Sequence, residues 1–305
     1  MSKKRYYEFK TYLQSTFDTI VHKIAIDAGF SCPNRNGSIS SGGCIYCNNK
    51  GSGTGALAKG LSIREQILTG QYYLKKRYKA KKFLAYFQSF SNTYAPVDIL
   101  EKRYNEALDC EDMIGLCIGT RPDCVDDNKL DLIRNYCRDY CVWVEYGLQS
   151  FHDTTLDRIN RGHGVKDFLT ALDKTRARNI NVCAHVILGL PGETKEDMMR
   201  TAQQLGRLDI QAVKIHLLYV IKGTALEKQY REGNYYCLSE KDYIDIAGEF
   251  IAWLPPDIII QRLTSDPHGY ELIAPSWCAD NKEGFLKKFH THLENMDLWQ
   301  GKYIN

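Results

Sequence analysis

The stretch NVCAHVILGLPGETKED, residues 181–197, holds one complete strand-to-helix unit of the fold. Its first part, 181–190, is a nearly continuous apolar run rich in β-branched residues, typical of a strand buried on both faces in a parallel sheet. Gly189 and Gly192 then permit a tight turn. Thr194 follows as a helix N-cap with acidic residues in the first turn behind it. The stretch therefore predicts a β–α unit.

The same alternation recurs along most of the chain. Strands are predicted at 21–27, 82–90, 113–120, 142–150, 181–190 and 212–220. Helices are predicted between them, one beginning with a capping box at Ser62 and another beginning at Ser239. Six such units imply an α/β fold with a parallel sheet, either an open, partial barrel or a doubly wound sheet. In both architectures the chemistry lies at the C-terminal ends of the strands.

The alternation stops after Pro256, which divides the chain into three parts. We expect an N-terminal segment at 1–20, a barrel core at 21–256 and a C-terminal extension at 257–305. The extension is predicted to hold one strand at 257–263 and one helix near 282–293. The N-terminal residues are polar, and no apolar run is long enough to span a bilayer. We therefore expect a cytoplasmic protein without membrane contact, and the sequence leaves its oligomeric state open.

Composition agrees with a globular protein that has a sizeable core. The chain has 305 residues, of which 44% are hydrophobic and 25% charged, with a formal net charge of +3. This mild positive charge permits an anionic partner without requiring one. The eleven cysteines are an odd number, which argues against a disulfide framework. Most of them lie in apolar runs, where a free cysteine packs as a small hydrophobic residue.

Three cysteines differ because they share a polar loop. The run CPNRNGSISSGGCIYC, residues 32–47, follows the first predicted strand and so lies at the C-terminal edge of the sheet. A structural zinc site needs four protein ligands, and this loop supplies three. Three thiolates on a [4Fe-4S] cluster leave one iron open to a cofactor or substrate. The ligand count therefore favours such a cluster on Cys32, Cys44 and Cys47, with three unrelated thiols as the alternative.

The loop resembles the cluster loop of radical S-adenosylmethionine (SAM) enzymes. Its wide first gap, CPNR start and GGCIYC end are similar to the Elongator-catalytic-subunit-like branch and, within it, to the bacterial YhcC/YtqA group. Further matches follow in order: TRPDC (120–124), EYGLQS (145–150), RINRGH (158–163), GLPGET (189–194) and LIAPSWC (272–278). The resemblance implies a partial (β/α)6 radical SAM barrel with a short C-terminal extension.

The resemblance also implies cofactors. Enzymes of this family cleave SAM reductively at a [4Fe-4S] cluster to a 5′-deoxyadenosyl radical, with electrons from a donor such as flavodoxin or ferredoxin. The candidate SAM-binding residues are Gln88, Ser89, Glu145, Gln149, Ser150, Arg161, His185, Ile187 and Gly189. Gln149 would contact the SAM ribose, and Arg161 the SAM carboxylate. The simpler alternatives are a surface arginine at 161 and a core histidine at 185.

Three basic features are candidates for substrate contact. Arg121 follows the third predicted strand and Lys222 the sixth, although Arg121 is equally suited to a salt bridge with Asp123 or Glu145. The run QYYLKKRYKAKK, residues 71–82, interleaves cations with tyrosines, as RNA-binding surfaces do. A solvated helix end has the same composition.

The resemblance makes tRNA the leading substrate. The Elongator catalytic subunit acts on the wobble uridine, and YtqA-type relatives are tied to the conversion of its carboxymethylaminomethyl group to aminomethyl. We therefore expect a radical SAM enzyme that modifies this position of tRNA. The alternatives are a radical SAM enzyme acting on a small molecule, and a non-catalytic iron–sulfur or zinc RNA-binding module.

Overall fold

The computed structural model describes residues 4–51, 53, 55–265, 270–279 and 282–304. The strands are β1 Val21–Ile26, β2 Lys82–Phe87, β3 Met113–Thr120, β4 Cys141–Gln149, β5 Asn181–Leu188, β6 Ala212–Leu217, β7 Val220–Ile221, β8 Ile259–Arg262 and β9 Leu272–Ala274. The α-helices are α1 Phe9–Phe17, α2 Ile63–Tyr78, α3 Val97–Leu108, α4 Asp127–Tyr136, α5 Asp153–Arg158, α6 Val165–Arg176, α7 Lys195–Leu205, α8 Ala225–Arg231, α9 Glu240–Ala252 and α10 Lys282–Asn295. Short 3₁₀ turns lie at Leu57–Lys59, Pro122–Cys124 and Ser276–Cys278.

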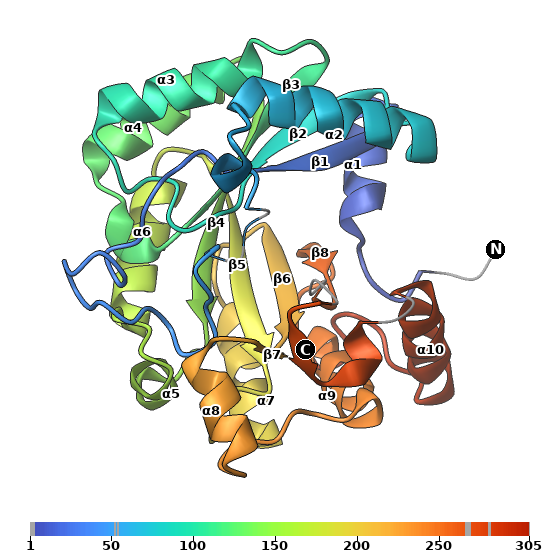
Figure 1. Ribbon diagram of the computed structural model, residues 1–305. Helices are drawn as coiled ribbons and strands as arrows, with labels where there is room; N and C mark the ends of the chain where they lie inside the picture. Colours follow the sequence, from blue (N-terminus) through green and yellow to red (C-terminus); the bar gives the residue numbers. More distant parts are fainter. Residues whose placement is uncertain (1–3, 52, 54, 266–269, 280–281, 305) are drawn as a thin grey trace.

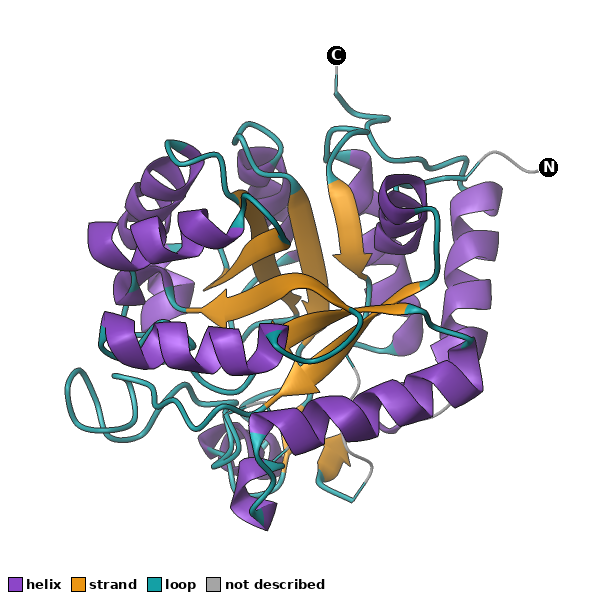
Figure 2. Cartoon of the chain, turned by 90° about the horizontal axis from the view of Figure 1, so that it is seen from above, coloured by secondary structure: helices purple, strands orange, loops and turns teal. Residues whose placement is uncertain are grey.

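Seven strands form a parallel sheet in the order β1-β2-β3-β4-β5-β6-β8. The spatial order follows the chain and never reverses, so right-handed crossovers keep the connecting helices on one face of the sheet. Figure 1 shows the sheet curving from β1 to β8 with α2, α3, α4 and α6 outside it, and Figure 2 shows helices surrounding the central strands. The fold is therefore the partial barrel, and the doubly wound alternative is wrong.

All six predicted core strands form, and several end earlier than predicted. Where β6 stops at Leu217, the next residues turn away and Val220–Ile221 pairs antiparallel with Leu272–Ala274 as a separate small sheet. The strand predicted at 257–263 forms as β8 and pairs with β6, so the main sheet has a seventh strand. The sequence did not predict α1. No helix in the described part of the chain is long and apolar enough to cross a membrane.

Helix α1 closes the N-terminal end of the barrel. Its Phe9 and Leu13 pack on inward-facing strand residues that include Trp143, with the Phe9 and Trp143 rings 5.9 Å apart in an edge contact. The segment before α1 also pairs with the last strand, where the Ile260 N–H donates to the Tyr7 carbonyl at 2.8 Å. With this end covered by apolar side chains, the C-terminal ends of the strands form the open end of the barrel.

Candidate functional site

A cavity of about 350 Å³ lies at the C-terminal ends of the strands. Its wall includes residues from the loop after β1 and from the ends of β2 to β6. The predicted site residues on this wall are Cys32, Cys44, Cys47, Gln88, Arg121, Glu145, Gln149, Arg161, His185 and Ile187. The fold therefore brings together most of the residues that the sequence singled out, although they span more than half of the chain.

The cysteine loop is held against the segment that follows α5. The buried Asn34 side chain donates to the Asn160 carbonyl at 2.6 Å and to Cys44 Sγ at 3.7 Å. In return, Asn160 Nδ2 donates to the Gly43 carbonyl at 2.7 Å. These reciprocal amide contacts fix Cys44 relative to the residue next to Arg161. The sequence analysis did not single out Asn34, although it lies inside the quoted CPNR run.

The spacing of the three loop thiols bears on which metal they could bind. Among the described residues, Glu145, Cys183 and His185 form the group of three possible metal ligands whose ligand atoms all lie within 4.8 Å of one another. The three loop cysteines do not meet this criterion. At least one pair of the loop sulfurs is therefore farther apart than this. Thiolates on one zinc ion at about 2.3 Å would lie roughly 4 Å apart, whereas a four-iron cluster binds each thiolate through a different iron. The wider spacing fits the cluster better than zinc.

Cations lie beside these thiols. Desolvation by the surrounding protein raises the pKa of Cys47 to about 12, and the neighbouring Cys44 adds to this, while Arg35 and Arg161 act in the opposite direction. Arg161 Nη1 donates to Cys44 Sγ at 3.5 Å. Thiols must lose their protons to bind iron, and nearby guanidinium groups favour the resulting thiolates. The donor set therefore fits a cluster held by three thiolates.

Arg161 is positioned by the end of β4. Its Nε and Nη2 atoms donate to the Gly147 carbonyl at 3.2 and 2.6 Å. A Cβ atom at position 147 would lie 2.5 Å from Arg161 Nη2 and 2.6 Å from Gln149 Nε2, so both side chains depend on this glycine. Gln149 has φ of 80° beside a register shift, which redirects the strand end. Arg161 is 8% exposed, so the surface-arginine alternative is wrong.

Arg121 is held within the protein. Its Nε and Nη2 atoms donate to the two oxygens of Asp123 at 2.9 and 2.7 Å, and its Nη1 donates to the Arg161 carbonyl at 2.6 Å. Of the two roles considered for this arginine, the geometry supports the salt bridge with Asp123. Arg121 therefore holds the segment that carries Arg161, and its contacts give no support to binding of substrate.

Four predicted site residues do not lie on the cavity wall. They are Ser89, Ser150, Gly189 and Lys222. Ser150 is buried, and its hydroxyl donates to the Glu193 carboxylate. Ser89 is buried against Gly53, where a Cβ atom would lie 1.7 Å from the serine oxygen.

The other two are displaced by the turns that follow their strands. The Gly189 carbonyl accepts from the Tyr235 hydroxyl at 3.0 Å, which turns the glycine toward a neighbouring loop. Lys222 follows the short strand β7, and its side chain is exposed. Position at a strand end therefore did not suffice to place these residues in the cavity.

A buried charged network lies at the cavity wall, deeper in the barrel. The fully buried Glu145 carboxylate accepts from Lys23 at 2.5 Å, Lys214 at 2.6 Å and His185 at 2.7 Å. Lys23 also donates to Gln261 at 2.6 Å, and so joins β1 to β8 across the open seam. Burial alone would raise the pKa of Glu145, but the two lysines and His185 together hold it well below its usual value.

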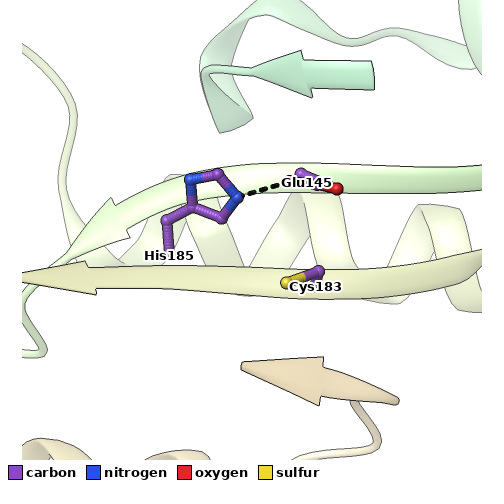
Figure 3. A group of neighbouring side chains, drawn as sticks. All are labelled: Glu145, Cys183 and His185. Carbon is purple, nitrogen blue, oxygen red and sulfur yellow. Dashed lines mark hydrogen bonds and ion pairs between the residues drawn. The ribbon is translucent and has the colours of Figure 1, made fainter. Parts of the chain in front are cut away.

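Glu145, Cys183 and His185 lie close enough to bind a metal by distance alone (Figure 3). However, both oxygens of Glu145 are already bound by lysine ammonium groups. Burial also raises the pKa of Cys183 well above its usual value, which favours the neutral thiol. A cation would have to displace two lysines and deprotonate the thiol, so we assign no metal to this group. Lys23 and Lys214 were not singled out in the sequence, although a lysine inside an apolar strand is an available signal.

The basic run at 71–82 lies at the other end of the barrel. The Lys81 and Lys82 N–H groups donate to the Ile20 carbonyl, just before β1 begins, at 2.9 and 3.3 Å. The run begins at Gln71, in the middle of the 16-residue helix α2, and continues past the end of that helix at Tyr78. Tyr72 is 70% exposed and Tyr73 is 51% exposed. The run is therefore an exposed surface of cations and aromatic rings, remote from the cysteines.

Comparisons with known proteins agree with this geometry. The Radical SAM superfamily matches residues 37–205, and the Radical_SAM C-terminal domain matches residues 210–295. YtqA of Bacillus subtilis is 37% identical over 303 residues, which cover 99% of this chain and 94% of YtqA. The tRNA uridine(34) acetyltransferase of Dehalococcoides mccartyi is 28% identical over 156 residues, which cover 50% of this chain and 33% of that enzyme.

A solved structure confirms the fold. Elp3 of Methanocaldococcus infernus superposes with a TM-score of 0.71 at 17% identity, covering 92% of this chain and 64% of that one. Enzymes of the matched superfamily use SAM and a [4Fe-4S] cluster, and the resemblance read from the cysteine loop is confirmed. The chain therefore belongs to the radical SAM superfamily and is related to Elp3-type enzymes and to YtqA.

Proposed function

We propose that this chain binds a [4Fe-4S] cluster through Cys32, Cys44 and Cys47, binds SAM beside it, and modifies the wobble uridine of tRNA. The proposed reaction converts a carboxymethylaminomethyl side chain to aminomethyl. The observation that carries the proposal is the shared cavity, which has three thiols and the polar ends of β2, β4 and β5 on its wall. Its volume of about 350 Å³ falls in the range of small-molecule and cofactor sites.

When bound, the cluster and SAM would supply abstraction of a hydrogen atom from a carbon that no ordinary base deprotonates. The chain's own residues would bind and orient the cluster and SAM. Three thiolates would hold three irons, and the Arg161 guanidinium beside Cys44 would pair with the SAM carboxylate. Gln149, Gln88 and Ile187 would line the rest of the SAM site.

Two observations support tRNA as the substrate. A relative that matches half of this chain is named a tRNA uridine(34) acetyltransferase. The exposed run at 71–82 presents Lys76 and Arg77 among tyrosines, with Arg77 lying 5.9 Å from the Tyr73 ring centroid. Phosphates attract cations and unstacked bases attract aromatic rings. Because the chain matches 33% of that relative's length, we transfer the uridine target and leave acetyl transfer aside.

Anaerobic reconstitution tests the cofactor part of the proposal. We expect about four irons per chain, and 5′-deoxyadenosine after addition of SAM and a reductant, either dithionite or a flavodoxin-type or ferredoxin-type donor. Cys47→Ala should lose both. Cys110→Ala is a matched control, because that thiol is buried and lies outside the loop. One tightly bound zinc without SAM cleavage would refute the proposal and favour a binding module.

Nucleoside analysis tests the substrate part. Total tRNA from cells lacking the gene should accumulate carboxymethylaminomethyl-uridine at the wobble position, and the purified enzyme with SAM should convert it. If 5′-deoxyadenosine forms but no tRNA nucleoside changes in cells or in vitro, the tRNA substrate is refuted. A radical SAM enzyme acting on a small molecule would then be the better description.

A further inference from the structure

The contacts of Glu145 determine where the proton of His185 lies. A lysine ammonium group only donates hydrogen bonds, so Lys23 and Lys214 both require acceptor oxygens on Glu145. With its pKa held well below the usual value, Glu145 is an anion and cannot donate to the histidine. The 2.7 Å contact between His185 Nε2 and Glu145 Oε2 must therefore carry its hydrogen on Nε2.

The other ring nitrogen lies on the far side of the ring from Glu145. In Figure 3, Nδ1 of His185 lies on the side away from Glu145, toward the C-terminal end of β5. His185 is on the cavity wall, and its side chain is 13% exposed. A neutral imidazole that donates through one nitrogen accepts through the other. Nδ1 is therefore a hydrogen-bond acceptor presented to whatever occupies the cavity.

We propose that Glu145, Lys23 and Lys214 are positioning residues that fix His185 in one tautomer, so that its Nδ1 accepts a hydrogen bond from a ligand hydroxyl. The chemical class of that ligand is a hydroxyl-bearing nucleoside, an assignment that rests on the proposed function. Glu145 then acts through the histidine. In this arrangement it does not itself touch the ligand, whereas the sequence analysis expected it to bind SAM.

Lys214 has a second effect in this arrangement, which is to keep His185 uncharged. A carboxylate next to an imidazole favours the charged imidazolium, which would donate from both nitrogens and lose the acceptor. Here burial first, and then the charge of Lys214, lower the pKa of His185 to about 4 despite Glu145. The neighbouring His216 ring, 5.3 Å away, is also kept neutral, because burial and then the charges of Arg262 and Lys214 lower its pKa.

The remaining groups near His185 do not change this balance. Tyr86 of β2 lies under Lys214, with the ammonium nitrogen 4.1 Å from the ring centroid, and burial raises the pKa of that tyrosine well above its usual value. Tyr86 is therefore neutral. We expect His185 to be an uncharged acceptor through the range from pH 6 to 9.

Nitrogen-15 NMR of the reconstituted protein labelled at histidine tests the tautomer directly. His185→Gln identifies the signals of this ring among the eight histidines. We expect Nε2 to show the protonated type of shift and Nδ1 the unprotonated type from pH 6 to 9. A proton on Nδ1, or a cationic ring at pH 7, would overturn the proposal. This measurement needs neither SAM turnover nor tRNA, so its result is independent of the proposed function.

A pH profile separates positioning from a merely structural role. With Lys214→Met, the pKa of His185 should rise above about 4, because burial still lowers it but one of the neighbouring positive charges is gone. Affinity for the probe S-adenosylhomocysteine should then match wild type at pH 8.5 and fall below wild type at pH 5, by up to about tenfold, as expected for loss of one hydrogen bond. Lys195→Met is the control, since that lysine pairs with Glu249 on the surface.

An equal loss of affinity at every pH would refute the positioning role. Because Lys214 is buried, its variant can fail to fold. Lys23→Met removes the other cation from the same carboxylate and predicts a shift of the same sign. If the variant that folds binds the probe as wild type does at both pH values, the proposal is also wrong. A proton on Nδ1 in the NMR spectrum of the wild-type protein would overturn it independently.

Discussion

Gly147→Ala should displace the Arg161 guanidinium and leave the fold intact. The added Cβ atom would lie 2.5 Å from Arg161 Nη2 and 2.6 Å from Gln149 Nε2, and both atoms are ends of flexible side chains. Carbon and nitrogen atoms pack at about 3.5 Å, so each side chain must move by roughly 1 Å. The three heavy atoms nearest to the added Cβ all belong to these two side chains, so no backbone atom has to move.

The size of the effect follows from the contacts that Arg161 would lose. The guanidinium donates twice to the Gly147 carbonyl, at 3.2 and 2.6 Å, and once to Cys44 Sγ at 3.5 Å. A hydrogen bond from a charged group contributes about 1.5–3 kcal/mol. If Arg161 binds the ligand carboxylate, its displacement should weaken binding by about 10-fold to 100-fold. The free energy of unfolding should fall moderately as well, because the buried guanidinium loses contacts, and the lower entropy of the unfolded chain with alanine offsets only about 0.4–1 kcal/mol of that loss.

Equilibrium dialysis of S-adenosylhomocysteine against the reconstituted variant measures the loss of affinity. Thermal unfolding of the same variant measures its stability. Gly42→Ala is the matched control, because it lies in the cysteine loop and its Cβ would lie 4.0 Å from the nearest heavy atom, Asn160 Nδ2. We expect the control to bind as wild type does. Affinity of Gly147→Ala within twofold of wild type would refute the role of Arg161, and a collapse of thermal stability would refute the claim that only side-chain ends must move.

Three further outcomes follow from buried and exposed groups. Asn34→Leu should lower the free energy of unfolding by about 1–3 kcal/mol, measured in urea, because the Asn160 carbonyl loses its partner. His163 has a pKa lowered to about 2 by burial and then by Arg161 and Arg121. As pH falls below about 6.5, His163 is protonated in the unfolded chain but stays neutral in the folded chain. The free energy of unfolding therefore falls by up to ~1.4 kcal/mol per pH unit. His163→Gln should reduce this slope between pH 6 and 5. Replacing Lys76 and Arg77 by serine should weaken tRNA binding and flatten its salt dependence, and unchanged binding would identify the run as a solvated helix end.

The strands and the cysteine loop could be predicted because their signals are local. An apolar β-branched run between capped helices specifies a buried parallel strand wherever it occurs, and the loop after β1 must lie at the C-terminal edge of the sheet. The helix α1 gave a weaker signal, because it buries mainly Phe9 and Leu13 and is otherwise polar or half-buried. Its role in closing the barrel depends on strand residues far away in the sequence.

The partners of the charged residues could not be predicted in the same way. Arg121 follows β3 as expected, yet whether it meets Asp123, Glu145 or a substrate depends on the direction of one side chain. In strands that are apolar on both faces, alternation also does not reveal which face is inside the barrel. Lys23 and Lys214 therefore gave no indication that both point at Glu145 from strands 122 and 69 residues away in the sequence.

The position of the basic run at 71–82 relative to the cavity sets a geometric requirement on the substrate. A uridine that reacts must reach the cavity edge, where the cysteines lie. Within the 71–82 run, Tyr72 and Arg77 lie about 14 and 21 Å along α2 from its first residue, Ile63. If the 71–82 run contributes to binding at all, the substrate must be long enough to lie along the outer face of α2 while one base enters the barrel, and a folded tRNA meets that requirement.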